Sequence, residues 1–179
     1  MLTTGIRLLF IGLFYNDPLG LCYTASMNKN IRIKKQGSGL LIGYAIQFIA
    51  GMTLNLFVTI SKPHPGYKAS NYFVGIFHAL IWSLDGNGGL ALAIHAYLAI
   101  ILVLGSLSLL ATSIKFGLPK WIWLSVIAAV FTIGALFNGL SYVNYGHNIS
   151  SMIMACCWLV AVSAIVFGLF APTRSYSKS

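Results

Sequence analysis

Four long apolar stretches restrict the fold of this chain more than any other feature of its sequence. Each is close to the roughly 20 residues that a helix needs to cross the hydrocarbon core of a bilayer. Backbone groups in lipid must be hydrogen-bonded within the protein, so each stretch is expected to be a helix. The predicted spans are residues 40–60, 88–113, 121–143 and 149–171. The sequence therefore predicts an all-α membrane protein, an antiparallel four-helix transmembrane bundle that occupies residues 40–171.

The composition agrees with this class of protein. Of the 179 residues, 58% are hydrophobic and only 7% are charged, whereas ordinary soluble domains carry about 25% charged residues. A soluble fold of this length could not cover its surface with so few charges. We therefore expect an integral membrane protein with a single helical domain, surrounded by membrane lipids.

The basic residues lie beside the apolar spans, and the net charge is +9 because the only acidic residues are Asp17 and Asp85. Lys and Arg at span ends are typical of topology signals and of contacts with anionic headgroups, so no nucleic acid is expected as a partner. If the first span starts in the cytoplasm, only Lys62 and Lys68 among the basic residues near the spans fall outside. Those that fall inside are Lys29, Arg32, Lys34, Lys35, Lys115, Lys120, Arg174 and Lys178. The positive-inside rule then predicts a multi-pass protein with both termini in the cytoplasm.

Residues 1–39 are expected to form a basic cytoplasmic leader. Their first part contains "GIRLLFIGLF", an apolar run that is too short to span a bilayer and is similar to the core of a signal peptide. Met27 begins "MNKNIRIKKQGSG", which reads like a cytoplasmic leader. Residues 1–26 are therefore interpreted as a mis-assigned start or a weak signal-like segment, and residues 172–179 as a cytoplasmic tail.

The longest connection between spans contains a shorter apolar segment, "YFVGIFHALIWSL", at residues 72–84. It is too short to cross a bilayer, and a crossing here would reverse the positive-inside count. We expect a re-entrant or interfacial helix on the outer face. The following "DGNGG" is expected to end this helix, with Asn87 as the cap of the second span.

Small and polar residues recur at every fourth position of the first span, as Gly43, Gln47, Gly51, Asn55 and Thr59. Residues spaced in this way lie along one side of a helix. Membrane helices approach each other through such residues, because lipid supplies no hydrophobic drive between helices. This side of the first span is therefore expected to face the other helices.

Three strongly polar residues lie at similar depths below the outer ends of their spans. At 1.5 Å per residue, Asn55 and Asn138 lie roughly 7–8 Å deep and His95 roughly 10 Å deep. We predict that they form a polar pocket that opens outward. His95 is the only ionisable residue well inside a predicted span, and such residues are usually functional. His95 can alternatively be a neutral imidazole that bonds Asn55, Asn138 or a carbonyl and only fixes helix register, or a residue that transfers protons. The residues expected to support the pocket are Gln47, His147 and Ser151.

Two functions of different classes fit this pocket. The first is a binding or accessory membrane protein that holds a small solute, a lipid headgroup or a helix of a partner protein or second copy. The second is a redox membrane protein with b-type haem or a quinone, since helical bundles hold cofactors and haem iron accepts His or Met. Copper is a variant, because both His and Met suit that ion. The candidate haem or copper ligands are His95, His78, His147, Met52 and Met152.

Enzymatic chemistry is not favoured, and no catalytic residue is assigned. Both acidic residues lie outside the predicted spans, so no pair of carboxylates is expected within the bilayer. Ser150 and Ser151 lie near His147, but no carboxylate accompanies them, and serine commonly caps a helix at such a position.

Several short motifs resemble those of small bacterial membrane proteins that have no assigned activity. They are "QFIAGMTLNLFV", "KPHPG", "IHAYLAI", "FNGLSY" and "SSMIMA", and the resemblance covers about residues 40–158. It implies a four-span integral protein of the bacterial cytoplasmic membrane, and it implies no particular reaction or ligand.

Overall fold

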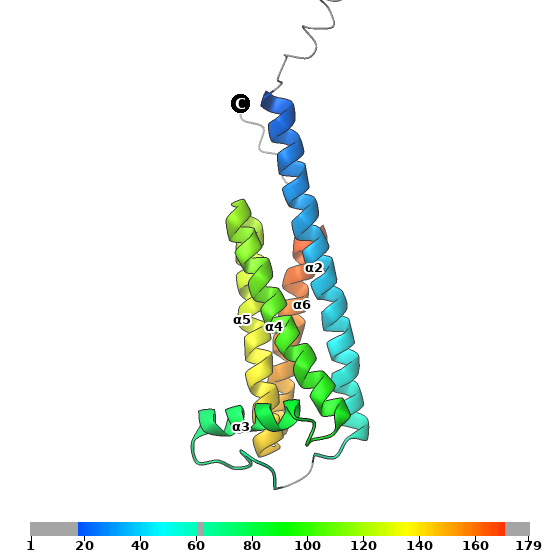
Figure 1. Cartoon of the computed structure of the whole chain (residues 1–179), viewed down its shortest axis with the longest axis vertical. Helices are drawn as coiled ribbons and strands as arrows, with labels where there is room; N and C mark the ends of the chain where they lie inside the picture. The colour runs from blue at the N-terminus through cyan, green and yellow to red at the C-terminus, as the bar shows by residue number, and fades with distance from the viewer. Residues whose placement is uncertain (1–17, 61–62, 171–179) are drawn as a thin grey trace, which may run out of the picture. The chain divides into compact units, whose positions relative to one another are not determined.

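The computed structural model describes residues 18–60 and 63–170. This part of the chain consists of five helices and contains no strand (Figure 1), so the predicted all-α class is confirmed for it. The helices are α2 (Pro18–Phe57), α3 (Tyr72–Leu84), α4 (Leu90–Phe116), α5 (Pro119–Tyr145) and α6 (Asn148–Phe170). Residues 1–17 and the predicted tail at 172–179 lie outside the described residues, so both interpretations stay predictions.

Four of these helices are long and apolar enough to cross a membrane, which indicates a multi-pass membrane protein. They are Lys29–Phe57, which is part of α2, Leu90–Phe116, Pro119–Tyr145 and Asn148–Phe170. The last three begin and end within three residues of the predicted spans. The remaining helix, α3, has 13 residues and coincides with the short apolar segment predicted between the first two spans.

The first span differs from its prediction, because α2 runs without a break from Pro18 to Phe57. The sequence predicted a leader up to residue 39 and a span that ends at residue 60. Residues 28–39 contain no proline, and Lys, Arg and Gln are favourable in helices. Gly37 and Gly39 are less favourable in a helix, but α2 continues through both into the apolar part.

Turn chemistry on either side of α3 decides where two helices begin. Asn71 caps α3, because its Oδ1 accepts a hydrogen bond from the Val74 N–H (3.2 Å). The prediction that Asn87 caps the second span is wrong, since Gly89 occupies the cap position of α4 and no side chain bonds there. The Gly89 N–H donates to the Gly86 carbonyl (2.9 Å), and both glycines have positive φ. This turn takes up Asn87 and delays the start of the helix.

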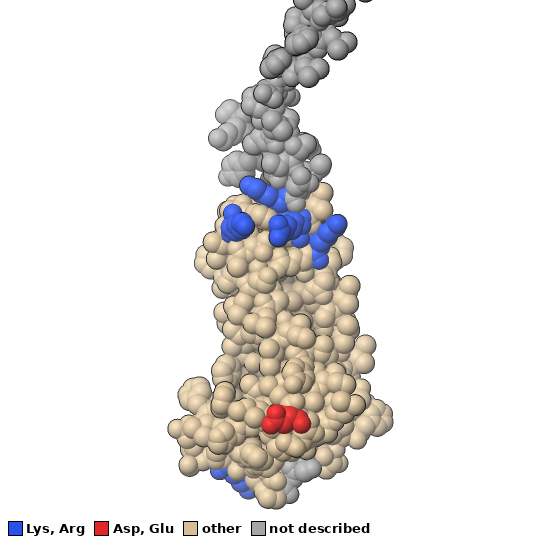
Figure 2. All heavy atoms as spheres, in the orientation of Figure 1, with Lys and Arg blue, Asp and Glu red and all other residues tan. Residues whose placement is uncertain are grey.

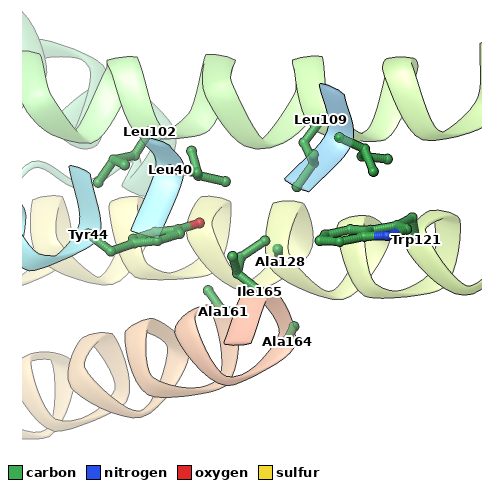
Figure 3. Close-up of a cluster of buried hydrophobic side chains, with 10 residues drawn as sticks. Leu40, Tyr44, Leu102, Leu109, Trp121, Ala128, Ala161, Ala164 and Ile165 are labelled. Atoms are coloured by element: carbon green, nitrogen blue, oxygen red, sulfur yellow. The ribbon is translucent and has the colours of Figure 1, made fainter. Parts of the chain in front are cut away.

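The chain divides into two compact units, Met1–Arg32 and Ile33–Ser179, and the packing described from here on lies within the second. Its main hydrophobic core lies where residues of α2, α4, α5 and α6 meet (Figure 3). Gly168 of α6 lies so close to Trp121 of α5 that a Cβ at this position would be 2.6 Å from the indole ring. Such small residues allow membrane helices to approach closely. The core residues are Ile33, Leu40, Tyr44, Leu102, Leu109, Trp121, Ala128, Ala161, Ala164 and Ile165.

Helix α3 lies across the ends of α4 and α5 and packs against both (Figure 1). Its Ala79 and Trp82 join Leu92 of α4 and Val143 of α5 in a second hydrophobic cluster. Phe77 of α3 is exposed. One side of this short helix is therefore buried in protein, while the other side is also apolar but is left uncovered by the described chain.

The described charged residues of the second unit lie toward the ends of the long helices (Figure 2). Lys115 is in the last turn of α4, and Lys120 is in the first turn of α5. Gln36 of α2 donates to Ser108 of α4 (2.9 Å), so Lys35 lies toward the same end. We call this the basic end and the opposite one the α3 end. Lys68, Asp85 and α3 itself lie at the α3 end, and Lys34 lies at the basic end.

The close contact between Gly168 and Trp121 generates a test of the core. Gly168→Ala is expected to lower the stability of the purified protein by about 1–3 kcal/mol, because overpacking forces neighbouring groups apart. Gly39→Ala is the matched control, since Gly39 is exposed and a Cβ there meets no atom within 4 Å. Thermal unfolding in detergent measures both variants. Equal midpoints for the two would contradict this description of the core.

Candidate functional site

A cavity of about 530 Å³ lies between the α3-end halves of the long helices. Ligand sites in proteins typically have volumes of about 300–1,000 Å³, so this cavity is the candidate site. Its wall consists mostly of aliphatic and aromatic side chains, and α3 contributes Leu80 and Ser83. None of the described residues that line it is Lys, Arg, Asp, Glu or Cys. Polar residues of the wall include Gln47, Asn55, Thr59, His95, Thr132 and Ser151.

An amide and an imidazole meet in the wall of this cavity. The Gln47 side-chain nitrogen lies 3.2 Å from His95 Nε2 and 3.2 Å from the His95 carbonyl oxygen. The amide group has two protons and can donate one to each. The reverse amide orientation would place two oxygens, both acceptors, against each other. His95 Nε2 is therefore assigned as an acceptor, which places the imidazole proton on Nδ1.

The other polar atoms of this pair are buried and have no hydrogen-bond partner among the described residues. They are Gln47 Oε1, an acceptor, and His95 Nδ1, which carries the proton. Gly51 lies along the ring, because a Cβ at this position would be 3.1 Å from His95 Cε1. A buried polar atom that lacks a partner costs about 1–3 kcal/mol. Both residues line the cavity, so a bound group that reached these two atoms would meet one acceptor and one donor.

Aromatic contacts close the cavity toward the basic end. The rings of Phe48 on α2 and Trp158 on α6 stack with centroids 5.0 Å apart. Trp158 Nε1 donates to the Tyr44 carbonyl (3.2 Å), and the Tyr44 hydroxyl donates to Thr132 of α5. The Thr132 hydroxyl in turn donates to the Ala128 carbonyl (2.6 Å). These contacts join α2, α5 and α6 and form the floor of the cavity, by which we mean its end nearest the basic end.

On two of its walls the cavity is lined by exposed side chains. Phe48 and Met52 of α2 are 50% and 43% exposed, and Asn55 is also exposed. Ala155 of α6 is exposed as well. On α4, by contrast, Leu102 of the wall is buried. The exposed part of the wall therefore belongs mainly to α2 and α6.

The structure brings together four of the six predicted pocket residues and leaves two apart. Gln47, Asn55, His95 and Ser151 line one cavity. Asn138 does not line it, and its Nδ2 donates to the Gly134 carbonyl within α5 (2.8 Å). His147 does not line it either. It is exposed just before α6, where its ring stacks with Tyr145 at 6.2 Å. The depth of a residue along its helix does not define the direction of its side chain, so Asn138 can match Asn55 in depth without facing the cavity.

The predicted haem and copper ligands do not gather around one point. Met52 lines the same cavity as His95, whereas His78 of α3 and Met152 of α6 are exposed. His95 Nε2, the usual ligand atom, already faces the amide of Gln47. Among the described residues, no group of three or more His, Cys, Asp or Glu is placed to hold a metal ion. The arrangement gives the haem and copper hypotheses no support.

Sequence reasoning missed a buried polar cap at the α3 end. His64 is 8% exposed and stacks on Trp82 of α3 with centroids 4.5 Å apart. Its Nε2 lies 3.2 Å from the Val143 carbonyl of α5. Asn144 is fully buried, and neither polar atom of its side chain has a hydrogen-bond partner among the described residues. The flanking prolines in "KPHPG" were the available signal, because proline fixes the backbone on either side of this histidine.

The contacts of His64 predict that it fastens the loop before α3 to the end of α5. His64→Ala removes the stacking on Trp82 and a buried hydrogen bond, so it should lower the free energy of unfolding by about 1–3 kcal/mol. Amide hydrogen exchange in residues 72–84 should become faster as well. His78→Ala is the matched control, because His78 is exposed on α3. Unchanged exchange in His64→Ala would show that this contact does not hold α3.

Comparison with known proteins adds no relative to this description. No protein-family model matches the chain, and neither the curated proteins nor the solved structures include one that is significantly similar to it. The resemblance to small bacterial four-span proteins therefore stays an expectation from sequence motifs, and the function must be argued from the cavity itself.

Proposed function

We propose that the four long helices form an antiparallel transmembrane bundle in the bacterial cytoplasmic membrane, with both ends of the chain in the cytoplasm. The distribution of basic residues supports this topology. Lys34, Lys35, Lys115 and Lys120 lie toward the basic end, whereas the α3 end has Lys68 together with Asp85. Cytoplasmic ends of membrane helices carry an excess of Lys and Arg. The α3 end, and with it the cavity, then belongs to the outer half of the membrane.

Within this bundle we propose that the protein binds a small molecule in the cavity, as a binding or accessory membrane protein. The observation that carries this proposal is the Gln47–His95 pair, whose remaining acceptor and donor are buried in the wall of a 530 Å³ space. A mainly apolar cavity with a few polar groups that fix orientation is the usual form of a ligand site. His95 is an ionisable residue within a long apolar helix, and such residues in membrane spans are usually functional.

The chemistry of the wall favours binding over catalysis. General acid–base chemistry requires a group whose pKa suits proton transfer, placed with a partner near the reacting atoms. The described residues of the wall offer hydroxyls, amides and one imidazole, but no carboxylate, lysine or cysteine. The lone imidazole is already paired with Gln47. Ser151 lines the cavity without a carboxylate to complete a nucleophilic set.

The proposed topology can be tested by labelling single cysteines in intact cells. The native Cys22, Cys156 and Cys157 are first replaced by serine. Lys68→Cys is then expected to react with a membrane-impermeant maleimide from outside, and Lys120→Cys only after the membrane is permeabilised. Labelling of Lys120→Cys in intact cells, to the same extent as Lys68→Cys, would overturn the orientation.

The proposed binding function can be tested by filling the cavity. Ala99 of α4 lines it, so Ala99→Phe should displace a bound molecule, whereas Ala111→Phe on the exposed side of the same helix should not. Native mass spectrometry of protein purified in mild detergent measures the bound mass. We expect an adduct on the wild type and on Ala111→Phe, and its loss from Ala99→Phe. The absence of any adduct, or an equal adduct on both variants, would refute binding in this cavity.

A further inference from the structure

We infer that the ligand is an uncharged lipid that carries a free hydroxyl group and reaches the cavity sideways, between α2 and α6. The inference rests on the proposed binding function and adds the ligand class and its route. Diacylglycerols and long-chain alcohols belong to this class. A water-soluble solute and an anionic phospholipid do not.

The route follows from which side chains of the wall are exposed. Met52 and Asn55 of α2 and Ala155 of α6 line the cavity and are exposed. In a membrane-spanning helix, exposed positions face acyl chains rather than water. A molecule in the cavity therefore meets the hydrocarbon of the membrane on this side. The contact of Phe48 with Trp158 closes the gap between the same two helices nearer the basic end.

The level of the opening follows from the same contacts. Asn55 lies two turns from Gln47 along α2, which is roughly 12 Å. The opening lies on the α3 side of the Phe48–Trp158 contact, so in the proposed topology it faces the outer leaflet. Leu80 and Ser83 of α3 line the cavity at its α3 end, and Ser83 is buried. A lipid of the outer leaflet is thus the molecule with the shortest path into the cavity.

The absence of charge in the described wall indicates an uncharged head group. No Lys, Arg, Asp or Glu is among the described residues that line the cavity. Moving an unpaired phosphate or carboxylate into such a site is costly, because nothing there compensates for the lost hydration. An anionic phospholipid would keep its head group at the membrane surface instead.

The Gln47–His95 pair indicates what the uncharged head should contain. Gln47 Oε1 can accept a hydrogen bond and His95 Nδ1 can donate one, and both atoms are buried without a partner among the described residues. A hydroxyl is the smallest uncharged group that donates and accepts at the same time. Asn55 and Ser151, nearer the α3 end, can bond further oxygens such as ester carbonyls. The hydrocarbon tail then leaves between Met52 and Ala155.

Photolabelling in nanodiscs tests this inference. Wild-type protein in phosphatidylcholine nanodiscs is exposed to a diacylglycerol with a diazirine in one acyl chain, and to phosphatidic acid with the same chains. We expect labelled peptides from α2 and α6 that include Met52 or Ala155. The diacylglycerol should label about tenfold more than phosphatidic acid, and unlabelled diacylglycerol should compete while glycerol should not. Equal or stronger labelling by phosphatidic acid, or competition by glycerol, would overturn the ligand class.

Two pairs of variants separate the head group from the route. Gln47→Leu should reduce diacylglycerol labelling about threefold to tenfold, the loss expected for one hydrogen bond. Gln36→Leu, at the basic end of the same helix, should not. Met52→Trp should block the opening, and Ile49→Trp, at an exposed position outside the wall, should leave labelling unchanged. If neither Gln47→Leu nor Met52→Trp differs from its control, the inference is refuted.

The outcome also separates this inference from the proposed function. If neither lipid labels the cavity, yet native mass spectrometry still shows an adduct that Ala99→Phe removes, the cavity binds a different class of molecule. Binding then stands and the lipid assignment fails. If no adduct exists and neither lipid labels, both fail together.

Discussion

The structure depends on the rule that polar groups inside a membrane must find their partners within the protein. The hydroxyls of Ser113 on α4 and Ser125 on α5 lie 3.0 Å apart. Each also donates to a carbonyl one turn earlier in its own helix, so one of the two protons is shared between that carbonyl and the other hydroxyl. Tyr44 and Thr132 connect α2 to α5 in the same manner. Lipid cannot form hydrogen bonds with these groups. They therefore hold the helices in register, whereas apolar contacts alone would allow one helix to slide along another.

Gln47 and His95 follow this rule only in part, and that distinguishes them from the serine and threonine hydroxyls of the core. The serine and threonine hydroxyls of the core have their bonds completed by backbone carbonyls or by each other. The Gln47–His95 pair fixes the tautomer of the imidazole but leaves two buried atoms unpaired. A pair that served helix packing alone could be replaced by apolar residues at a gain in stability. Its position beside a cavity is what connects it with the proposed ligand binding.

Much of the architecture was predictable from the sequence, because span length and the pattern of apolar residues follow from the thickness of the membrane. The short helix at Tyr72–Leu84 has the bounds of the apolar segment that the sequence predicted between the first two spans. The continuous α2 was not, because the change from basic to apolar residues marks a membrane boundary and not a helix boundary. Of the predicted pocket residues, Gln47, Asn55, His95 and Ser151 line one cavity, and their role as a binding site stays a prediction. Asn138 does not line this cavity, and its Nδ2 donates to the Gly134 carbonyl, because its depth in the sequence does not give the direction of its side chain.

The floor formed by Phe48, Trp158 and Tyr44 has a mechanical consequence for α2. Toward the basic end, the helix is fastened by Gly37 against Trp121 and by Gln36 to Ser108. Around and beyond Phe48, α2 contacts His95 of α4 through Gln47 and Gly51. Its Leu54 packs against the second hydrophobic cluster, while Met52 and Asn55 are exposed. If α2 pivoted at the stacked rings, its part beyond Phe48 would swing away from α6. The opening between α2 and α6 would then widen, while the core toward the basic end stayed packed.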